Sequence, residues 1–264
     1  MELYHNDMSV CAQKVRIVLA EKSLDWKDNH MNLFKGESRT DKYKELNPKG
    51  VVPTLITESG EIIIESTVIT EYLDEAFPAP PLKPANPYSV ALMRLWTKQV
   101  DEGIHISTTA VSNGIAFRYA HLDGKTDVEI KEHFDRIPDA SRREMLWDLT
   151  NKGIESKYFS TSIHRFEKLF DDMDAVLKEN KWLAGDDYSL ADIALTPYIT
   201  RIDHLHLLGL LDRRVNLLRW YDNVRERDSY KVAIQERLEQ HIVNLMAEKG
   251  RECFDKVKKL LENA

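Results

Sequence analysis

The sequence predicts two domains of different fold class: a small N-terminal α+β domain and a larger C-terminal domain built only from helices. Three observations predict this division. Residues 1–77 alternate short apolar runs with helical patterns, residues 78–87 are rich in proline, and the patterns in residues 88–264 are helical. A chain of 264 residues also suits two domains, since one domain usually holds about 100–200 residues.

The N-terminal domain is predicted to contain four strands and three helices. The strands are expected at 2–5, 26–33, 52–56 and 62–64, and the helices at 12–22, 38–46 and 66–76. A helix between the first two strands makes them parallel, and a turn at Ser59-Gly60 makes the last two an antiparallel hairpin. This mixed sheet is the arrangement of a thioredoxin-like domain.

The rest of the chain is predicted to be a proline-rich linker followed by helices. Five prolines between Phe77 and Pro87 indicate a stiff linker. Long helices are expected at 88–117, 161–179, 189–208, 216–227 and 229–261. Residues 118–160 are charged and interrupted by glycine and proline, which predicts short helices joined by loops. The segment 189–208 is apolar over most of its length and is expected to be the buried central helix.

Composition argues against several functions and locations. The net charge of −7 argues against nucleic acid as a partner, and no apolar run approaches the roughly 20 residues that span a membrane. The N-terminus lacks the pattern of a secretory signal. The only cysteines, Cys11 and Cys253, form no disulfide framework and indicate a reducing cytoplasm. His204 and His206 have few acidic or cysteine companions, so no metal site is expected.

The first candidate site is Ser9-Val10-Cys11, between the first strand and the first helix. A serine here can cap the helix with its hydroxyl oxygen. The same hydroxyl can donate a hydrogen bond to a thiolate bound at the helix start, where the helix dipole also favours negative charge. Both effects lower the pKa of the thiol. Ser9 is therefore predicted either to cap the helix only or to activate a bound thiol as well.

Two further dipeptides predict positions for a peptide-like ligand. If the Val52–Pro53 bond is cis, the backbone N–H and C=O of Val52 can pair with an extended ligand, whereas a trans bond would be an ordinary strand start. Ser66 opens a helix whose free N–H groups suit a carboxylate, and Glu65 can pair with an ammonium group. The alternative for Ser66 is a helix cap alone. Ser189 and Asp192 form a capping box, which we assign to folding.

These segments together resemble those of the soluble glutathione transferases, over essentially the whole chain. The resemblance rests on Ser9-x-Cys11, Asn47-Pro48-x-Gly50-x-Val52-Pro53, Glu65-Ser66, and the run from Leu183-Ala184-Gly185-Asp186 to Asp192. The start Ser9-Val10-Cys11 is similar to the Ser-Ser-Cys of zeta members, without the second serine. The helix around Trp96–Glu102 and the charged insertion look more like the bacterial β-etherases, which cleave β-aryl ethers by thiol attack.

The resemblance implies a glutathione transferase fold, a homodimer, a cytoplasmic location and glutathione as co-substrate, without a metal. It also implies that a glutathione thiolate attacks a hydrophobic electrophile, with β-aryl ether cleavage as the alternative reaction. The residue that it implies for catalysis is Ser9. The residues that it implies for glutathione binding are Val52, Pro53, Glu65 and Ser66. In some members an acid from the fourth helix of the other subunit reaches the γ-glutamyl ammonium group, which makes Asp101 a further candidate.

Two other functions stay open at this point. A cysteine at a helix start can be a redox nucleophile, so Cys11 could support a glutathione-dependent thiol–disulfide reductase. In omega-type members, however, the cysteine occupies the place of Ser9, and Cys11 could equally be a small buried hydrophobe. The chain could also be a non-enzymatic stress or interaction protein. The presence of Ser9, Pro53, Glu65 and Ser66 argues against that function.

The insertion from Arg118 to Ser160 is too long for a simple connection between helices, which usually takes about 2–8 residues. We expect it to form, with the preceding helix, an apolar pocket for an aromatic electrophile above Ser9. The side chains expected to line this pocket are Ile104, Ile106, Val111, Ile115, Phe117, Tyr119, Phe134, Met145 and Trp147. The alternative is that the insertion only covers the outer surface or a dimer contact.

Overall fold

The computed structural model describes residues 1–262, and its N-terminal part is built on a four-stranded sheet. The strands are β1 (Glu2–His5), β2 (Lys27–His30), β3 (Thr54–Ile56) and β4 (Ile62–Ile64), in the order β2-β1-β3-β4. β1 and β2 are parallel and β3 and β4 are antiparallel, as the sequence predicts. β1 also pairs with β3 in antiparallel orientation. Leu3 lies opposite Leu55, and both are fully buried.

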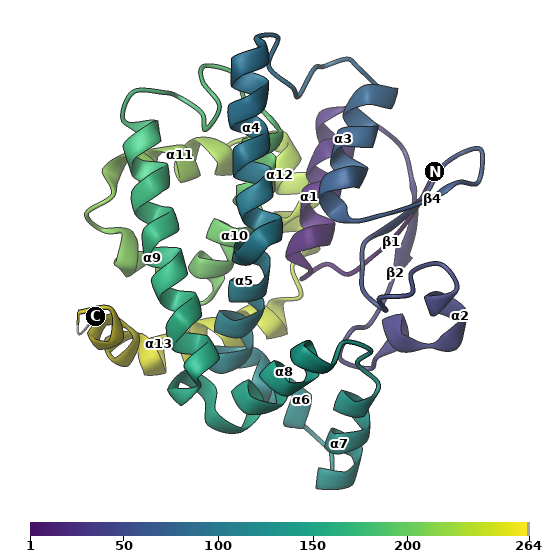
Figure 1. Cartoon of the computed structure of the whole chain (residues 1–264), viewed down its shortest axis with the longest axis vertical. Coiled ribbons are helices and arrows are strands. Elements are labelled where there is room, and N and C mark those ends of the chain that lie inside the picture. The colour runs from purple at the N-terminus through teal and green to yellow at the C-terminus, as the bar shows by residue number, and fades with distance from the viewer. Residues whose placement is uncertain (263–264) are drawn as a thin grey trace.

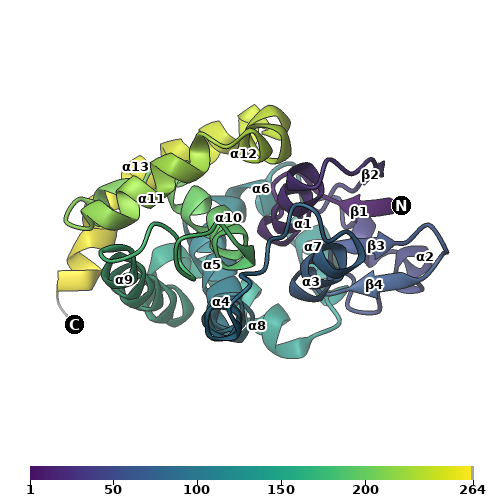
Figure 2. The same ribbon diagram turned by 90° about the horizontal axis from the view of Figure 1, so that it is seen from above.

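Helices cover both faces of this sheet. α1 (Val10–Glu21) and α3 (Ser66–Ala76) lie on the face toward the C-terminal helices, and the short η1 (Glu37–Arg39) and α2 (Asp41–Lys44) lie on the other side (Figure 2). The predicted helix 38–46 is split because Thr40 is extended and caps α2 by accepting a hydrogen bond from the Tyr43 N–H. β2 is shorter than the predicted strand 26–33.

One nearly continuous helical run follows the linker and forms the middle of the molecule (Figure 1). It consists of α4 (Pro87–Gln99), the π-helical η2 (Val100–Ile104), α5 (His105–Ser112), the π-helical η3 (Asn113–Phe117) and α6 (Arg118–Leu122). Asn86 caps α4 through its side-chain oxygen, and Pro87 occupies the first turn, where its missing N–H has no cost. The sequence predicts a helix over most of this run but not its π-helical segments.

The remaining elements are helices, and the insertion folds as the predicted short helices. They are α7 (Asp127–Asp135), α8 (Ala140–Lys152), η4 (Gly153–Glu155), α9 (Lys157–Leu177), α10 (Leu190–His204), η5 (Leu208–Leu211), α11 (Val215–Arg225), α12 (Asp228–Ala233), η6 (Gln235–Arg237) and α13 (Gln240–Glu262). The single helix predicted for 229–261 is divided because the chain leaves helical conformation at Ile234 and Leu238. Over residues 1–262, none of the helices has both the length and the apolar character to cross a bilayer.

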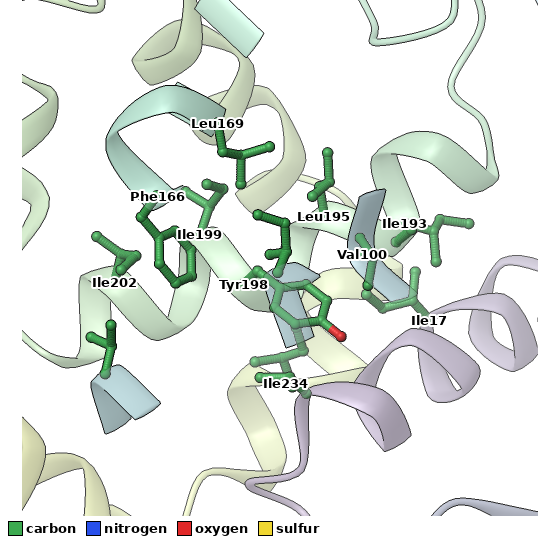
Figure 3. Packing of buried hydrophobic residues seen from close by; sticks show 14 of the residues in the cluster. Ile17, Val100, Phe166, Leu169, Ile193, Leu195, Tyr198, Ile199, Ile202 and Ile234 are labelled. Carbon is green, nitrogen blue, oxygen red and sulfur yellow. The ribbon is translucent and has the colours of Figure 1, made fainter. Parts of the chain in front are cut away.

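α10 is the centre of the core, as predicted from its apolar sequence. It packs against α1, α4 and α5, and Figure 3 shows its side chains surrounded by apolar residues from several helices. The predicted capping box is present: the Ser189 hydroxyl accepts from the helix, and the Asp192 carboxylate accepts from the Ser189 N–H. The same carboxylate accepts from the Leu183 N–H and from the Trp220 indole, at 3.0 and 2.8 Å. Asp192 thereby ties α10 to two other segments.

Candidate functional site

Ser9 stands at the N-terminus of α1, where its side chain is partly exposed. Its Oγ accepts a hydrogen bond from the Ala12 N–H at 3.3 Å, so the predicted cap is present. A hydroxyl group is one donor and two acceptors. Because the cap uses only an acceptor position, the Ser9 hydroxyl proton remains free for a ligand. Capping and thiol activation are therefore compatible at this residue.

The turn before Ser9 is held by buried polar contacts. Asn6 accepts the Met8 N–H through its side-chain oxygen at 3.0 Å. The Met8 carbonyl in turn accepts from the guanidinium of Arg201 on α10, which also donates to Ser112 at 2.9 Å. Arg201 is buried and lies over the ring of Phe117. Contacts from the C-terminal helices thus hold the turn that precedes Ser9.

The Val52–Pro53 peptide bond is cis, which is one of the two alternatives that the sequence left open for this bond. Tyr43 and Asn47 hold the preceding residue, because the Tyr43 hydroxyl and the Asn47 side-chain amide each donate to the Val51 carbonyl at 2.9 Å. Within residues 1–262, the backbone N–H and C=O of Val52 have no hydrogen-bond partner. They are the groups that an extended ligand backbone would use.

The N-terminus of α3 is open, and the cap alternative for Ser66 is wrong. Glu65, not Ser66, occupies the N-cap position, and no side chain caps the helix. Glu65 has φ +70°, in the left-handed region that non-glycine residues rarely adopt and that often marks functional sites. Its carboxylate is paired with Lys49 at 2.6 Å, and both side chains are exposed. Ser66 is buried at the start of a helix whose first N–H groups are free.

Cys11 lies beside a histidine that the sequence does not point to. The Cys11 Sγ is 3.4 Å from Nδ1 of His105 on α5 and 3.8 Å from the hydroxyl of Tyr198 on α10, and the Ser66 side chain also contacts it. Burial raises the pKa of the Cys11 thiol, but His105, Lys14 and Ser66 together outweigh burial and lower it to about 6. Sequence reasoning missed His105 because it is 94 residues away in the chain.

Asp101 lies beside the first turn of α3 in its own chain. Its carboxylate accepts from the Thr67 hydroxyl at 3.0 Å, and that hydroxyl oxygen accepts from the buried ammonium group of Lys14 at 3.3 Å. A lysine on the buried side of α1, among apolar residues, is the one sequence signal that could have indicated this network. The structure therefore brings Asp101, Ser66 and Cys11 to the same junction of α1, α3 and the central helical run.

The side chains expected to line the pocket at the insertion differ in their burial. Some of its expected side chains belong to the core and others to the outer surface, because residues such as Ile104 and Ile106 point to different faces of one helix. The buried ones are Ile104, Val111, Ile115, Phe134 and Met145, and the exposed ones are Ile106, Tyr119 and Trp147. Phe134 and Trp147 line a cavity of about 260 Å³ between α7 and α8.

The insertion does contact the N-terminal part of the chain. The Phe34 ring packs edge-on against Phe117, with centroids 5.5 Å apart, and also against His121. Arg39 donates to the His133 carbonyl at 2.9 Å. Burial lowers the pKa of His121 to about 3 and that of His133 to about 4, so both rings are neutral at pH 7. Phe34 and Phe117 form an aromatic wall. Arg201, which lies over the Phe117 ring, links this wall to the carbonyl of Met8, the residue before Ser9.

This arrangement supports the chemistry of a bound thiol. It combines a free hydroxyl proton at one helix start, an uncapped second helix start and an unpaired backbone segment at a cis proline. In the described residues, no three side chains of histidine, cysteine, aspartate or glutamate converge as they would to hold a metal ion.

Comparison with known proteins identifies the family. The glutathione S-transferase N-terminal domain model matches residues 8–76, and the glutathione S-transferase C-terminal domain model matches residues 161–223. The chain is 30% identical over 196 residues to Protein LigF of Sphingobium sp. (strain NBRC 103272 / SYK-6), covering 73% of this chain and 75% of that protein. It is 43% identical over 201 residues to a maleylacetoacetate isomerase of Pseudomonas aeruginosa, covering 75% and 80%.

A solved structure agrees with the sequence comparison. The crystal structure of the β-etherase LigF from Sphingobium sp. strain SYK-6 matches with a TM-score of 0.80 at 25% identity, covering 89% of this chain and 98% of that one. The resemblance that the sequence motifs suggest is thereby confirmed. This chain belongs to the glutathione S-transferase family, and it is a glutathione transferase.

Proposed function

We propose that glutathione binds in an extended form across the junction of β3, α1 and α3. Its cysteinyl backbone pairs with the free N–H and C=O of Val52, beside Pro53. Its γ-glutamyl carboxylate meets the uncapped start of α3 at Ser66, and its ammonium group meets Glu65. Asp101 lies close enough to the same helix start to add a second negative charge there.

The observation that carries this proposal is the meeting of two helix N-termini at one place. α1 packs against α3, and Ser66 at the start of α3 contacts Cys11 in the first turn of α1. A carboxylate at one helix start and a thiolate at the other would both be stabilised by the helix dipoles. Glutathione carries both groups in one molecule.

The reaction that follows is attack of the glutathione thiolate on an electrophilic carbon. Ser9 donates a hydrogen bond to the sulfur, which keeps it ionised. A carbon–sulfur bond forms, the bond to the leaving group breaks, and the leaving group departs with the electron pair of that bond. Holding both reactants together supplies most of the remaining acceleration.

A second candidate is cleavage of aryl ethers, in which the leaving group is a phenolate. Two observations favour it: the match to the β-etherase LigF over 89% of this chain, and the aromatic wall of Phe34 and Phe117. An aromatic ring of the substrate would stack on this wall while the thiolate attacks the adjacent ether carbon. A panel of β-aryl ethers and chloronitrobenzenes distinguishes the two reactions.

We expect the Ser66→Ala variant to bind glutathione about 5- to 30-fold more weakly, because a hydrogen bond to a charged group is worth about 1–2 kcal/mol. Isothermal titration calorimetry measures this change. The pKa of the bound glutathione thiol should hardly move, since Ser9 is unchanged. Ser141→Ala is a matched control, because Ser141 is an exposed serine in the first turn of α8. An unchanged dissociation constant for Ser66→Ala would refute this part of the site.

We expect the Phe117→Ala variant to lose selectivity for aromatic electrophiles. Its ring is half of the aromatic wall, and losing such a contact is worth about 1–3 kcal/mol, or 10- to 200-fold in kcat/KM. The measurement is the ratio of kcat/KM for 1-chloro-2,4-dinitrobenzene to that for a small alkyl halide. Tyr119→Ala serves as the control, because Tyr119 is exposed on α6. An unchanged ratio in both variants would place the electrophile elsewhere.

The homodimer implied by the family has a candidate surface in this chain. Ile62 on β4, Val68 on α3, and Tyr88 and Leu95 on α4 are large apolar side chains that stand 46–70% exposed. We propose that a second copy covers them, and sedimentation of the full chain tests this. We further propose a cytoplasmic location, where thiols remain reduced; cell fractionation tests that proposal.

A further inference from the structure

A cavity lies at the C-terminal end of α1, the opposite end of this helix from Ser9. Its volume is about 480 Å³, and small-molecule sites usually measure about 300–1,000 Å³. α12 packs beside α1 and forms one wall of the cavity (Figure 2), while the residues between α1 and β2 form another. None of the lining residues belongs to the proposed glutathione site. The cavity is therefore a separate place on the molecule.

One part of the lining is apolar and open to a ligand. Val232 on α12 is 50% exposed, although it is a large apolar residue. The ring of Trp26 is partly buried and is held by the guanidinium of Arg237, which lies 5.1 Å from the ring centroid. Such a surface suits the apolar or aromatic body of a small molecule. The apolar lining consists of Leu19, Ala20, Leu24, Trp26, Val232 and Ala233.

The two cations that line the cavity already have partners within the chain. Arg237 lies 2.8 Å from the Asp28 carboxylate and 3.4 Å from that of Asp7. Arg16 is buried, and its guanidinium donates to the carbonyl of Ala233 at 2.9 Å and to that of Asp7 at 3.0 Å. An anionic ligand would have to compete with these contacts.

The negative groups at the cavity are less completely paired. Asp228 pairs with Lys231 at 2.9 Å, but the exposed carboxylate of Asp25 has no hydrogen bond or ion pair to any residue in 1–262. The C-terminal end of a helix carries a partial negative charge, and the last turn of α1 holds no basic residue to offset it. Lys22, at the C-cap, directs its ammonium group to Asp74 at 2.8 Å. A cation is therefore favoured at this end of the cavity.

We propose that this cavity is a second ligand site, which takes a small organic amine with an aromatic or branched aliphatic body. The body lies against Leu19, Ala20, Val232 and the Trp26 ring. The ammonium group lies near the Asp25 carboxylate and the C-terminal end of α1. Because the cavity shares no residue with the glutathione site, the amine and glutathione bind at the same time.

The direct test is isothermal titration calorimetry of the full chain with 2-phenylethylamine, which is a cation at pH 7. We expect a dissociation constant of about 1 mM or below, as suits a ligand of this size. Phenylacetate has a similar body with the opposite charge. It should bind at least about tenfold more weakly, because its carboxylate would face that of Asp25. No binding of 2-phenylethylamine, or equal binding of the two compounds, would overturn the proposal.

Two variants locate the bound amine. Asp25→Asn should weaken binding by about 3- to 5-fold, the scale of a solvent-exposed ion pair. Ala20→Leu adds three carbon atoms where the body lies and should weaken binding by at least about tenfold through overlap with the ligand. Asp123→Asn is the control for charge, because Asp123 is an exposed acid at the end of α6, outside the cavity.

Conjugation of 1-chloro-2,4-dinitrobenzene shows that each variant is folded, and saturating glutathione should leave the affinity for the amine unchanged. Competition between the two ligands, or unchanged binding in a folded Ala20→Leu variant, would place the amine elsewhere and contradict the site. Unchanged binding in Asp25→Asn would contradict the recognition of its charge. Because the amine is titrated without an electrophile, these results do not depend on the proposed conjugation reaction.

Discussion

Replacing Ser9 by alanine is expected to lower the rate of glutathione conjugation at pH 7 by roughly 100-fold. The hydroxyl proton of Ser9 is not used by the cap, which only accepts a hydrogen bond from Ala12. It is therefore available to the thiolate, and losing a donor aimed at a reacting anion costs about 100- to 1,000-fold in other enzymes. Glutathione affinity should change little, because the proposed contacts with Val52, Glu65 and Ser66 remain.

The pH dependence of this variant has a definite sign. Without the hydroxyl donor the pKa of the bound thiol rises, so at a given pH below it the thiolate fraction falls tenfold for each unit of the rise. Raising the pH should then restore activity to Ser9→Ala more than to the wild type. Ser9→Thr, which keeps a hydroxyl, is the matched control and should retain most of the activity. Full activity of Ser9→Ala at neutral pH would mean that another group activates the thiol. Cys11 and His105 would then be the next residues to test.

Replacing Asp192 by alanine is expected to destabilise the fold by about 3–5 kcal/mol. Its buried carboxylate accepts hydrogen bonds from the Ser189 and Leu183 N–H groups and from the Trp220 indole. Each buried donor left unpaired costs about 1–3 kcal/mol, and the lost side chain also leaves a cavity. The expected loss is thus large for a residue that touches no substrate.

Denaturant unfolding of Asp192→Ala, followed by fluorescence of the buried Trp220, measures this loss. Asp187→Ala is the control, because Asp187 is an exposed acid just before the same capping box and should change stability by less than about 0.5 kcal/mol. The folded fraction of Asp192→Ala should still conjugate glutathione. A variant with wild-type stability would show that neither the capping box nor the links to Leu183 and Trp220 stabilise the fold.

The parts of the fold that local sequence determines were predicted. The parallel pairing of β1 and β2, the hairpin at Ser59-Gly60 and the capping box at Ser189 each depend on residues close together in the chain. The apolar character of α10 was enough to place it at the centre. The position of Ser9 at the start of α1 follows from the strand and helix patterns on either side of it.

The parts that depend on distant contacts were not predicted. π-helical segments have no sequence pattern of their own, so the sequence did not indicate that η2 would end at His105. Periodicity shows which faces of a helix are apolar but not what covers them, which is why Met145 was placed in a pocket and lies in the core. The pairing of Cys11 with His105 joins residues 94 positions apart, and single-sequence reasoning has no access to such contacts.

The most direct test of the central claim is to titrate the thiol of bound glutathione by the ultraviolet absorbance of its thiolate. The measurement is made in a chain that carries Cys11→Ser and Cys253→Ser, so that only the ligand sulfur contributes. We predict a pKa for the bound thiol below that of free glutathione, and a return toward the free value when Ser9→Ala is added. A bound thiol whose pKa is the same with and without Ser9 would contradict the claim that this chain activates glutathione at the start of α1.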